Sequence, residues 1–287
     1  MKKLILAGIV LVLAGAPGLM AQKGKKGEAA APAAQGDQPR GPMPKSKGEQ
    51  DALVAMFNAQ GKPDDLIAAA ENLLSKYADT EFKDTALFFE ATAYRQKGDR
   101  DKAQVFAERA LTANPKNFQA SLMLGELIAQ GTRENDLDRD DKLAKADKYS
   151  NDAITTLNAA AKPNAQMSDQ QWEDAKKDLI AEAHDSLGMS ALLRKKYDVA
   201  INEFKMSVDG AAHPEPAFQV RLASAYSSAG KYDEAIAAAD KVMNDAQTPT
   251  QIKQVAQSIR AGATVAKQKA AGGASAAAPP QVDIKKQ

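Results

Sequence analysis

The chain has no cysteine among its 287 residues. Disulfides, thiolate metal sites, thiol catalysis and lipid attachment to an N-terminal cysteine are therefore excluded. Aromatic residues are also scarce, at 5% of the chain. Because strands favour aromatic and β-branched residues whereas alanine favours helices, this alanine-rich composition predicts an all-α protein. With 38 basic and 37 acidic residues the formal net charge is only +1, so no overall field attracts nucleic acid and no nucleic-acid partner is expected.

Only one long apolar run is present, at the amino terminus. Lys2 and Lys3 precede an uncharged stretch that begins at Leu4, and the small residue Ala21 provides a cleavage position. This order is typical of a secretory signal peptide over residues 1–21, and it predicts an exported protein, periplasmic or secreted. The alternative is an uncleaved membrane anchor, but the run is shorter than the roughly 20 residues that a spanning helix needs. No membrane span is expected after cleavage.

Residues 22–47 and 271–287 differ in composition from the region between them. Both segments are rich in small residues and proline, and neither has apolar periodicity. Such segments bury too little apolar surface to offset the entropy of ordering the chain. We therefore expect a disordered linker over 22–47, a disordered tail over 271–287, and a folded region over 48–270.

A short sequence recurs within the folded region. Lys196–Ile201 reads KYDVAI, and Lys231–Ile236 reads KYDEAI 35 residues later. A period of this length indicates a repeat architecture, in which each repeat is a small helical unit that buries its apolar face against its neighbours.

The segment 84–117 resembles a single tetratricopeptide unit. Ala91 stands at the small position of its first helix, Tyr94 at the aromatic position, Gly98 in the turn and Pro115 at the end. The resemblance implies an all-α, right-handed α-solenoid of stacked helix-turn-helix repeats. Its units are expected at about 47–80, 84–117, 118–160, 181–214 and 216–249, followed by a terminal capping helix at 249–270.

Small residues in the first helices have a physical reason. Two antiparallel helices of a unit cross at this position, and a large side chain there would force the backbones apart. Gly188 takes this position in the fourth unit, whereas Gly131 opens a loop. Gly188→Leu is therefore expected to destabilise the protein more than Gly131→Leu.

The middle of the chain departs from the regular period. An insertion over 131–141 separates the two helices expected in the third unit. Farther on, Ser168 and Gln171 form a capping-box pattern. It predicts a new helix that runs from Asp169 to about Arg194 and is about twice as long as a usual helix of this repeat.

No pattern in the sequence supports an enzyme. The two histidines, His184 and His213, fall in different parts of one unit, where the first is expected to pack and the second to be solvated. Phosphate loops, dinucleotide fingerprints and nucleophile elbows are absent from the sequence. The chain is therefore predicted to have neither catalytic residues nor a cofactor.

The acidic insertion offers one alternative function, a calcium-dependent envelope binding module using residues 136–147. Carboxylates at alternate positions can wrap a calcium ion when the loop bends sharply. However, Asp141 stands where the bend needs glycine. The other interpretation is a solvated loop whose aspartates favour the start of the next helix. No metal is expected, and the ligands of the alternative would be Asp136, Asp138, Asp140 and Asp147.

The resemblance also implies a function, that of a non-catalytic protein–protein interaction scaffold or adaptor. Repeats of this family bind protein or peptide segments in a concave groove, and the first two units look like those of bacterial cell envelope assembly proteins. The lysine and asparagine clamp that some members use for C-terminal carboxylates is absent. The predicted groove residues are Phe88, Thr92, Arg95, Leu122, Glu126, Asp185, Met189, Val220 and Ser224. Alternatively, Phe88 and Leu122 pack between neighbouring helices.

Overall fold

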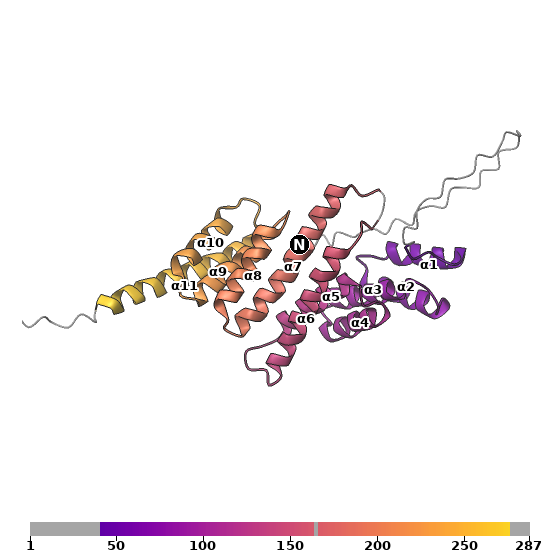
Figure 1. The fold of residues 1–287 in the computed structure, drawn as a ribbon, viewed down its shortest axis with the longest axis horizontal. Helices are drawn as coiled ribbons and strands as arrows, with labels where there is room; N and C mark the ends of the chain where they lie inside the picture. Colours follow the sequence, from indigo (N-terminus) through magenta and orange to yellow (C-terminus); the bar gives the residue numbers. More distant parts are fainter. Residues whose placement is uncertain (1–40, 164–165, 276–287) are drawn as a thin grey trace, which may run out of the picture. The chain divides into compact units, whose positions relative to one another are not determined.

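The computed structural model describes residues 41–163 and 166–275, and all the regular secondary structure in these ranges is helical. The predicted signal peptide, most of the predicted linker and residues 276–287 lie outside the described residues. Within them, none of the helices combines the length and apolar character that a membrane span requires. Figure 1 shows the helices in chain order: α1 Lys47–Asn58, α2 Pro63–Lys76, α3 Lys83–Gln96, α4 Arg100–Ala113, α5 Phe118–Gly131, α6 Arg139–Ala159, α7 Asp169–Leu193, α8 Tyr197–Gly210, α9 Pro216–Ser228, α10 Tyr232–Asn244 and α11 Thr250–Ser275.

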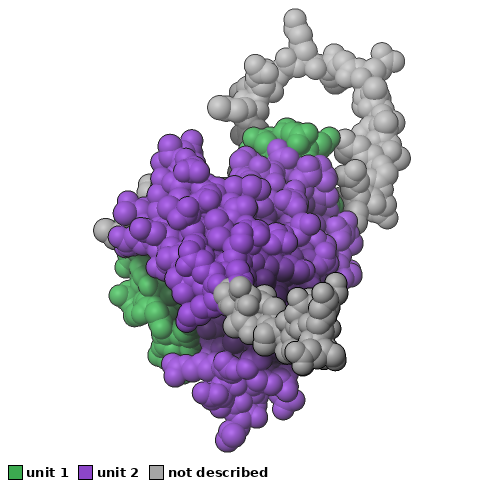
Figure 2. All heavy atoms as spheres, turned by 90° about the vertical axis from the view of Figure 1, so that its left-hand side faces the viewer, with its two compact units in different colours: residues 1–114, 161–172 green, residues 115–160, 173–287 purple. Residues whose placement is uncertain are grey.

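The described chain divides into two compact units, coloured separately in Figure 2. Unit 1 comprises residues up to Asn114 together with Ala161–Trp172, and unit 2 comprises Pro115–Ala160 and the residues from Glu173 onward. In unit 1, α1 packs on α2, α2 on α3, and α3 on α4. In unit 2, α5 packs on α6, α8 on α9, and α9, α10 and α11 all pack on one another. The predicted all-α architecture of stacked helix-turn-helix repeats with a terminal helix is confirmed.

Local sequence signals define where the helices begin. The side chains of Ser46, Asp99 and Asn117 accept hydrogen bonds from backbone N–H groups in the first turns of α1, α4 and α5. At α7 the capping box is formed as predicted, because the Gln171 N–H donates to Ser168 Oγ (3.1 Å) and the Ser168 N–H donates to Gln171 Oε1 (2.9 Å). Such bonds satisfy amide groups that the helix itself leaves without acceptors.

Glycine closes three of the turns between paired helices. Gly61, Gly98 and Gly230 have φ values of 85°, 79° and 75°, which side chains with a Cβ atom rarely adopt. At the turn between α7 and α8 the same left-handed conformation falls on Lys195, with φ of 59°. The turns after α1, α3 and α9 thus follow the regular pattern of the repeat, and the turn after α7 does not.

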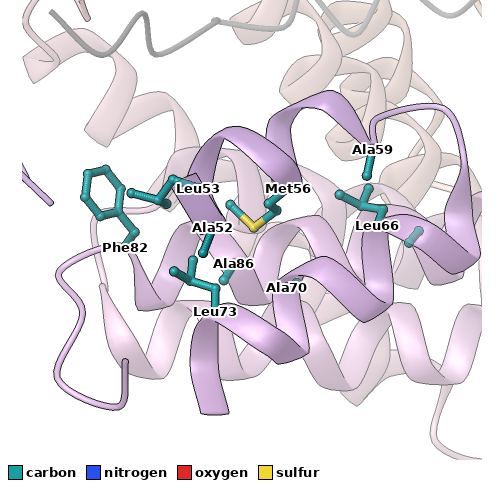
Figure 3. Close-up of a cluster of buried hydrophobic side chains, with 10 residues drawn as sticks. Ala52, Leu53, Met56, Ala59, Leu66, Ala70, Leu73, Phe82 and Ala86 are labelled. Atoms are coloured by element: carbon teal, nitrogen blue, oxygen red, sulfur yellow. The ribbon is translucent and has the colours of Figure 1, made fainter. Parts of the chain in front are cut away.

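The apolar core of unit 1 lies where α1, α2 and α3 meet (Figure 3). Leu53 and Met56 of α1, Leu66 and Leu73 of α2, and Phe82 just before α3 are fully buried. Burying a side chain of this size stabilises the fold by roughly 1.5–3 kcal/mol. Alanines fill the closer contacts between these helices, as the low aromatic content predicted.

The core of unit 2 includes three smaller clusters. One joins α5 and α6 to Ala183 of α7, the second joins α7, α8 and α9, and the third joins α9, α10 and α11. Each cluster therefore uses side chains from two consecutive helix pairs, as stacked repeats require.

Aspartate–lysine pairs connect consecutive repeats at the surface. The carboxylates of Asp64, Asp198 and Asp233, each in the first turn of a second helix, accept hydrogen bonds from Lys97, Lys231 and Lys267 respectively, 33, 33 and 34 residues later. We call these three pairs the one-repeat ladder. The carboxylates also lie where the helix dipole favours negative charge.

The structure differs from the sequence prediction at the third unit and at the end of the chain. The predicted insertion over 131–141 is only partly a loop, since α5 extends to Gly131 and α6 begins at Arg139. Acidic residues in the first turn, Asp140 and Asp141, favour this earlier start of α6. The terminal helix α11 continues to Ser275, past residue 270, because residues from Ala263 to Ala271 carry no helix-breaking proline.

Candidate interaction surface

The first helices of the repeats in unit 2 are α5, α7 and α9, and they carry six of the predicted groove residues. Asp185 of α7 and Arg221 of α9 are hydrogen-bonded, and the carboxylate of Glu126 on α5 acts electrostatically on Asp185; Met189 and Ser224 are half-buried residues of the same helices. We call this group the α5–α7–α9 surface and define it by Glu126, Asp185, Met189, Arg221 and Ser224. Met189, Ser224, Glu126 and Arg221 are half-buried.

Asp185 is the best-enclosed charged group of this surface. Only 4% of the residue is exposed, and Arg221 Nη1 donates a hydrogen bond to its Oδ2 atom at 2.6 Å. The other oxygen, Oδ1, is buried and has no hydrogen-bond partner among the described residues. A buried carboxylate oxygen without a partner costs free energy, because it gives up the water that would otherwise solvate it.

The surroundings of Asp185 raise its pKa to about 6. Burial is the main cause, since the charged form loses its hydration. The guanidinium of Arg221 lowers the pKa, whereas the carboxylates of Glu126 and Glu215 raise it by repulsion. One guanidinium and two carboxylates therefore act on Asp185 in opposite directions.

The apolar part of the predicted groove is not exposed. Phe88 is 4% exposed, Leu122 is 8% exposed and Val220 is 9% exposed. The prediction that they form an open apolar row is wrong for these three side chains, and Leu122 instead packs in the cluster that joins α5, α6 and α7. Burial removes the cost of exposing large apolar groups to water.

In unit 1 the three predicted residues of α3 also differ in exposure. Thr92 is buried, and its hydroxyl donates to the backbone oxygen of Phe88 at 3.0 Å. Arg95 is half-buried. Of the nine predicted groove residues, those that remain partly accessible are Arg95, Glu126, Met189 and Ser224. Binding of a partner by these residues stays a prediction.

The four carboxylates of the alternative calcium site in the acidic insertion are each paired with a basic side chain. Lys142 Nζ lies 3.1 Å from Asp136 Oδ2 and 2.9 Å from Asp138 Oδ1, so one lysine is paired with both carboxylates. Asp140 pairs with Arg139 at 3.0 Å, and Asp147 pairs with Arg194 at 2.9 Å. No cluster of three or more histidine, aspartate or glutamate side chains suited to a metal ion occurs in residues 41–163 and 166–275. Each of these carboxylates is therefore paired with a lysine or arginine side chain of the protein itself.

The two histidine rings each contact a carboxylate. His184 is half-buried, with Nδ1 2.8 Å from Glu203 Oε2, which is consistent with packing between α7 and α8. His213 is exposed, with Nδ1 2.9 Å from Asp178 Oδ2. Each ring is bonded to a carboxylate and, within the part of the chain that the structure describes, to no nucleophile, so neither contact resembles the base of a catalytic triad.

We expect the pKa of His213 to lie above the ordinary 6.5, because the Asp178 carboxylate bonds to its ring and favours the protonated form. In Asp178→Asn the pKa should return toward the ordinary value. NMR titration of the His213 ring measures both values, and the ring of His184 provides an internal control. An unchanged pKa for His213 in the variant would show that the contact is absent in solution.

Two residues that act on Asp185, Arg221 and Glu215, were missed by sequence reasoning. Both were outside the predicted groove positions. Arg221 lies 36 residues after Asp185, close to one repeat away. A basic residue about one repeat after an acidic residue is the same signal that the one-repeat ladder provides, and this spacing could have identified the pair.

A family comparison agrees with the repeat pattern. Residues 85–117 and 217–244 match the family model of the tetratricopeptide repeat. The first segment covers most of α3 and α4, and the second covers most of α9 and α10. These are two of the units predicted from the sequence, so the predicted resemblance to the tetratricopeptide repeat is confirmed at the level of the repeat.

The chain is also similar to solved structures of repeat proteins. A thermophilic tetratricopeptide repeat protein from Thermus thermophilus shares 20% identity over 74% of this chain and 98% of its own, with a TM-score of 0.46. A tetratricopeptide repeat protein from Parabacteroides merdae shares 17% identity over 79% and 93%, with a TM-score of 0.40. An assembly chaperone of RpL4 shares 12% identity over 78% and 99%, with a TM-score of 0.43. No curated protein matches the sequence.

Proposed function

We propose that this chain, which carries tetratricopeptide repeats, is a non-catalytic scaffold of the bacterial cell envelope and that it binds protein or peptide segments on its α5–α7–α9 surface. Repeats of this family are generally non-catalytic and bind protein partners. Export to the envelope is supported by the signal-peptide pattern over residues 1–21. The partner surface is supported by one observation, the bond of the half-buried Arg221 to the enclosed Asp185 on helices that also carry the half-buried Glu126, Met189 and Ser224.

A segment docks on such a surface by apolar contact and is oriented by charge. Met189 offers a flexible, polarizable side chain that adapts to different shapes. Ser224 offers a hydroxyl that both donates and accepts. Glu126, Asp185 and Arg221 supply the charges, whose pattern selects the partner more than it raises affinity.

Pull-down of partners from an envelope extract tests this function. The surface variant carries Met189→Arg and Ser224→Arg, which place two long charged side chains on half-buried positions. The matched loop variant carries Asp136→Asn and Asp138→Asn. We expect the surface variant to recover at least tenfold less of the cross-linked partners, quantified by mass spectrometry, and the loop variant to recover the wild-type amount.

Circular dichroism first establishes that both variants keep the wild-type helicity. If the loop variant loses the partners and the surface variant keeps them, the proposed surface is wrong. If the wild-type protein enriches nothing over a bead control, the scaffold function itself is wrong.

A further inference from the structure

We infer that the groove between α7 and α8 is a further docking site, for an amphipathic helix of a partner protein that carries a glutamate or aspartate beside its apolar stripe. The groove shares no residue with the α5–α7–α9 surface, so this inference goes beyond the proposed function. All its lining residues belong to unit 2.

The α7–α8 groove has a volume of about 520 Å³, within the range of roughly 300–1,000 Å³ that is usual for ligand-binding clefts. On each helix its lining residues stand at positions i, i+3, i+4 and i+7, which form one helical face. They are Lys177, Ile180, Ala181 and His184 of α7, and Asn202, Lys205, Met206, Asp209 and Gly210 of α8. The groove therefore follows both helices for two turns (Figure 1). A groove between two packed helices accepts the ridge of side chains of a third helix.

The first support is the apolar base of the groove. Ala181 is 1% exposed and Ile180 is half-buried, whereas Met206 at the edge is 36% exposed. A single exposed methionine is ordinary on a protein surface, but this one borders two further apolar side chains of the same groove. Methionine adapts its shape to different partners, and covering these side chains removes apolar area from water. The groove therefore favours a segment with an apolar stripe.

The second support is the charge of the groove walls. Lys205 of α8 lines the groove and has no hydrogen bond or ion pair with any described residue. Lys177 of α7 lies 4.0 Å from Asp174, too far for a hydrogen bond. Of the described lining residues Asp209 is the one that carries a carboxylate, so two ammonium groups stand against one carboxylate. An acidic side chain of the partner is therefore attracted to Lys205, whereas a basic one is repelled.

The position of Asp209 gives the docked helix a direction. Asp209 lies one turn after Lys205, directly before Gly210 at the carboxyl end of α8, where the helix also carries partial negative charge. Asn202 lies one turn before Lys205, is exposed, and offers an amide that both donates and accepts. The acidic residue of the partner is therefore expected beside Lys205 and Asn202, away from Asp209.

The third support is that the two walls are already held together. His184 Nδ1 of α7 lies 2.8 Å from Glu203 Oε2 of α8. The helices also approach closely at Gly188, where a Cβ atom would lie 2.6 Å from the Phe204 ring. A partner therefore meets a groove that exists before binding, and little affinity is lost to ordering it.

NMR titration with three helical peptides tests the groove. The protein carries labelled methionine methyl groups: Met206 reports on the groove, and Met243 of α10 is the internal control. The peptides are about 14 residues long, roughly 21 Å as helices, and share one leucine stripe. They differ only beside the stripe, where they carry glutamate, glutamine or lysine. We expect the glutamate peptide to shift the Met206 signal in a saturable way, with at least fivefold higher affinity than the glutamine peptide, and the lysine peptide to bind least.

A charge reversal locates the effect. In Lys205→Glu the lysine peptide should bind at least fivefold more tightly than the glutamate peptide, the opposite of the wild-type order. Lys241→Glu changes an exposed lysine of α10 in the same way and should keep the wild-type order. A misfolded variant cannot produce the reversed order. Absence of a saturable Met206 shift with the glutamate peptide, or an unchanged order in Lys205→Glu, would overturn the inference.

Two further measurements examine other occupants. If the Met206 signal moves with protein concentration in the absence of peptide, a second copy of the chain fills the groove and the inference is wrong. If vesicles of phosphatidylglycerol shift Met206 and the glutamate peptide does not, the groove binds an anionic lipid surface and the inference is again wrong.

The variant with Met189→Arg and Ser224→Arg separates the groove from the α5–α7–α9 surface. It should bind the glutamate peptide with wild-type affinity, because neither substitution touches a lining residue of the groove. If this variant loses the peptide while it keeps its helicity, the groove is not a separate site and the inference is wrong.

Discussion

Gly188→Leu is expected to destabilise unit 2 by about 1–3 kcal/mol, the usual cost of forcing extra methylene groups into a packed core. A Cβ atom placed on Gly188 would lie 2.6 Å from both Cδ1 and Cε1 of Phe204. The Phe204 ring belongs to α8, is fully buried and packs in the cluster of α7, α8 and α9, so it has no open space to enter. Gly188→Ala should therefore also lack the gain in stability that replacing glycine with alanine normally brings in a helix interior.

Thermal unfolding followed by circular dichroism measures this loss. In a protein of this size, each kcal/mol corresponds to a fall of roughly 2–4 °C in the midpoint temperature. Gly210→Leu is the matched control, because a Cβ atom on Gly210 meets nothing within 4 Å. Gly131→Leu is a second control, since Gly131 is exposed at the end of α5. Equal losses in all three variants would mean that α7 and α8 do not cross at Gly188.

Glu90→Gln is expected to stabilise unit 1 at pH 8 by up to about 3 kcal/mol, the free energy that corresponds to the pKa shift of the carboxyl. Glu90 lies in α3, only 1% of it is exposed, and its Oε2 atom has no hydrogen-bond partner among the described residues. Burial raises its pKa from 4.5 to about 7; Arg109 lowers the pKa and Glu71 raises it. At pH 8 the buried Glu90 side chain of the wild-type protein is therefore a charged carboxylate, and Glu90→Gln replaces it with a neutral amide.

The direction of the pH dependence follows from the two pKa values. The folded state holds the proton on Glu90 more tightly than the unfolded chain does. The contribution of this group to the free energy of unfolding is therefore fully present below pH 4.5 and is lost as the pH rises toward about 7. In Glu90→Gln this loss should disappear.

Hydrogen exchange of the α3 peptides, measured at several pH values, reports on the stability of unit 1 alone. This separation is needed because the raised pKa of Asp185 makes the stability of unit 2 fall with rising pH as well. Asp51→Asn is the matched control, because it removes one exposed charge from α1. If Glu90→Gln gives the same pH dependence of protection as the wild-type protein, Glu90 is not the group that titrates.

The repeat fold was predictable from short-range signals in the sequence. The recurring KYD segments gave the period, Gly188 and Ala91 marked helix crossings, and Ser168 with Gln171 located the start of α7. These signals depend on neighbours within a turn or a helix pair, which a sequence displays directly. The presence of repeats, the helix order and the terminal helix followed from them.

The groove was less predictable because first helices in a stack are apolar on more than one side. Leu122 has the spacing of a groove residue, yet it packs into the cluster shared with α6 and α7. Periodicity alone cannot separate a side chain that faces an open surface from one that faces the next repeat. Asp185 was placed among the groove residues, but its enclosure and its pairing with Arg221 depend on contacts between repeats that spacing within one helix does not report.

The one-repeat ladder has a consequence for how this protein could be lengthened. Each of its three pairs joins an aspartate to a lysine 33 or 34 residues later, so the distance between partners equals the length of a repeat. A second copy of residues 198–231, inserted after Lys231, would bring its own aspartate at the start of a second helix and its own lysine 33 residues later, and it would leave the original Asp198–Lys231 spacing unchanged. The ladder therefore restricts which insertions preserve these ion pairs. An insertion of one full repeat keeps each aspartate 33 or 34 residues before a lysine, whereas an insertion of a fraction of a repeat does not.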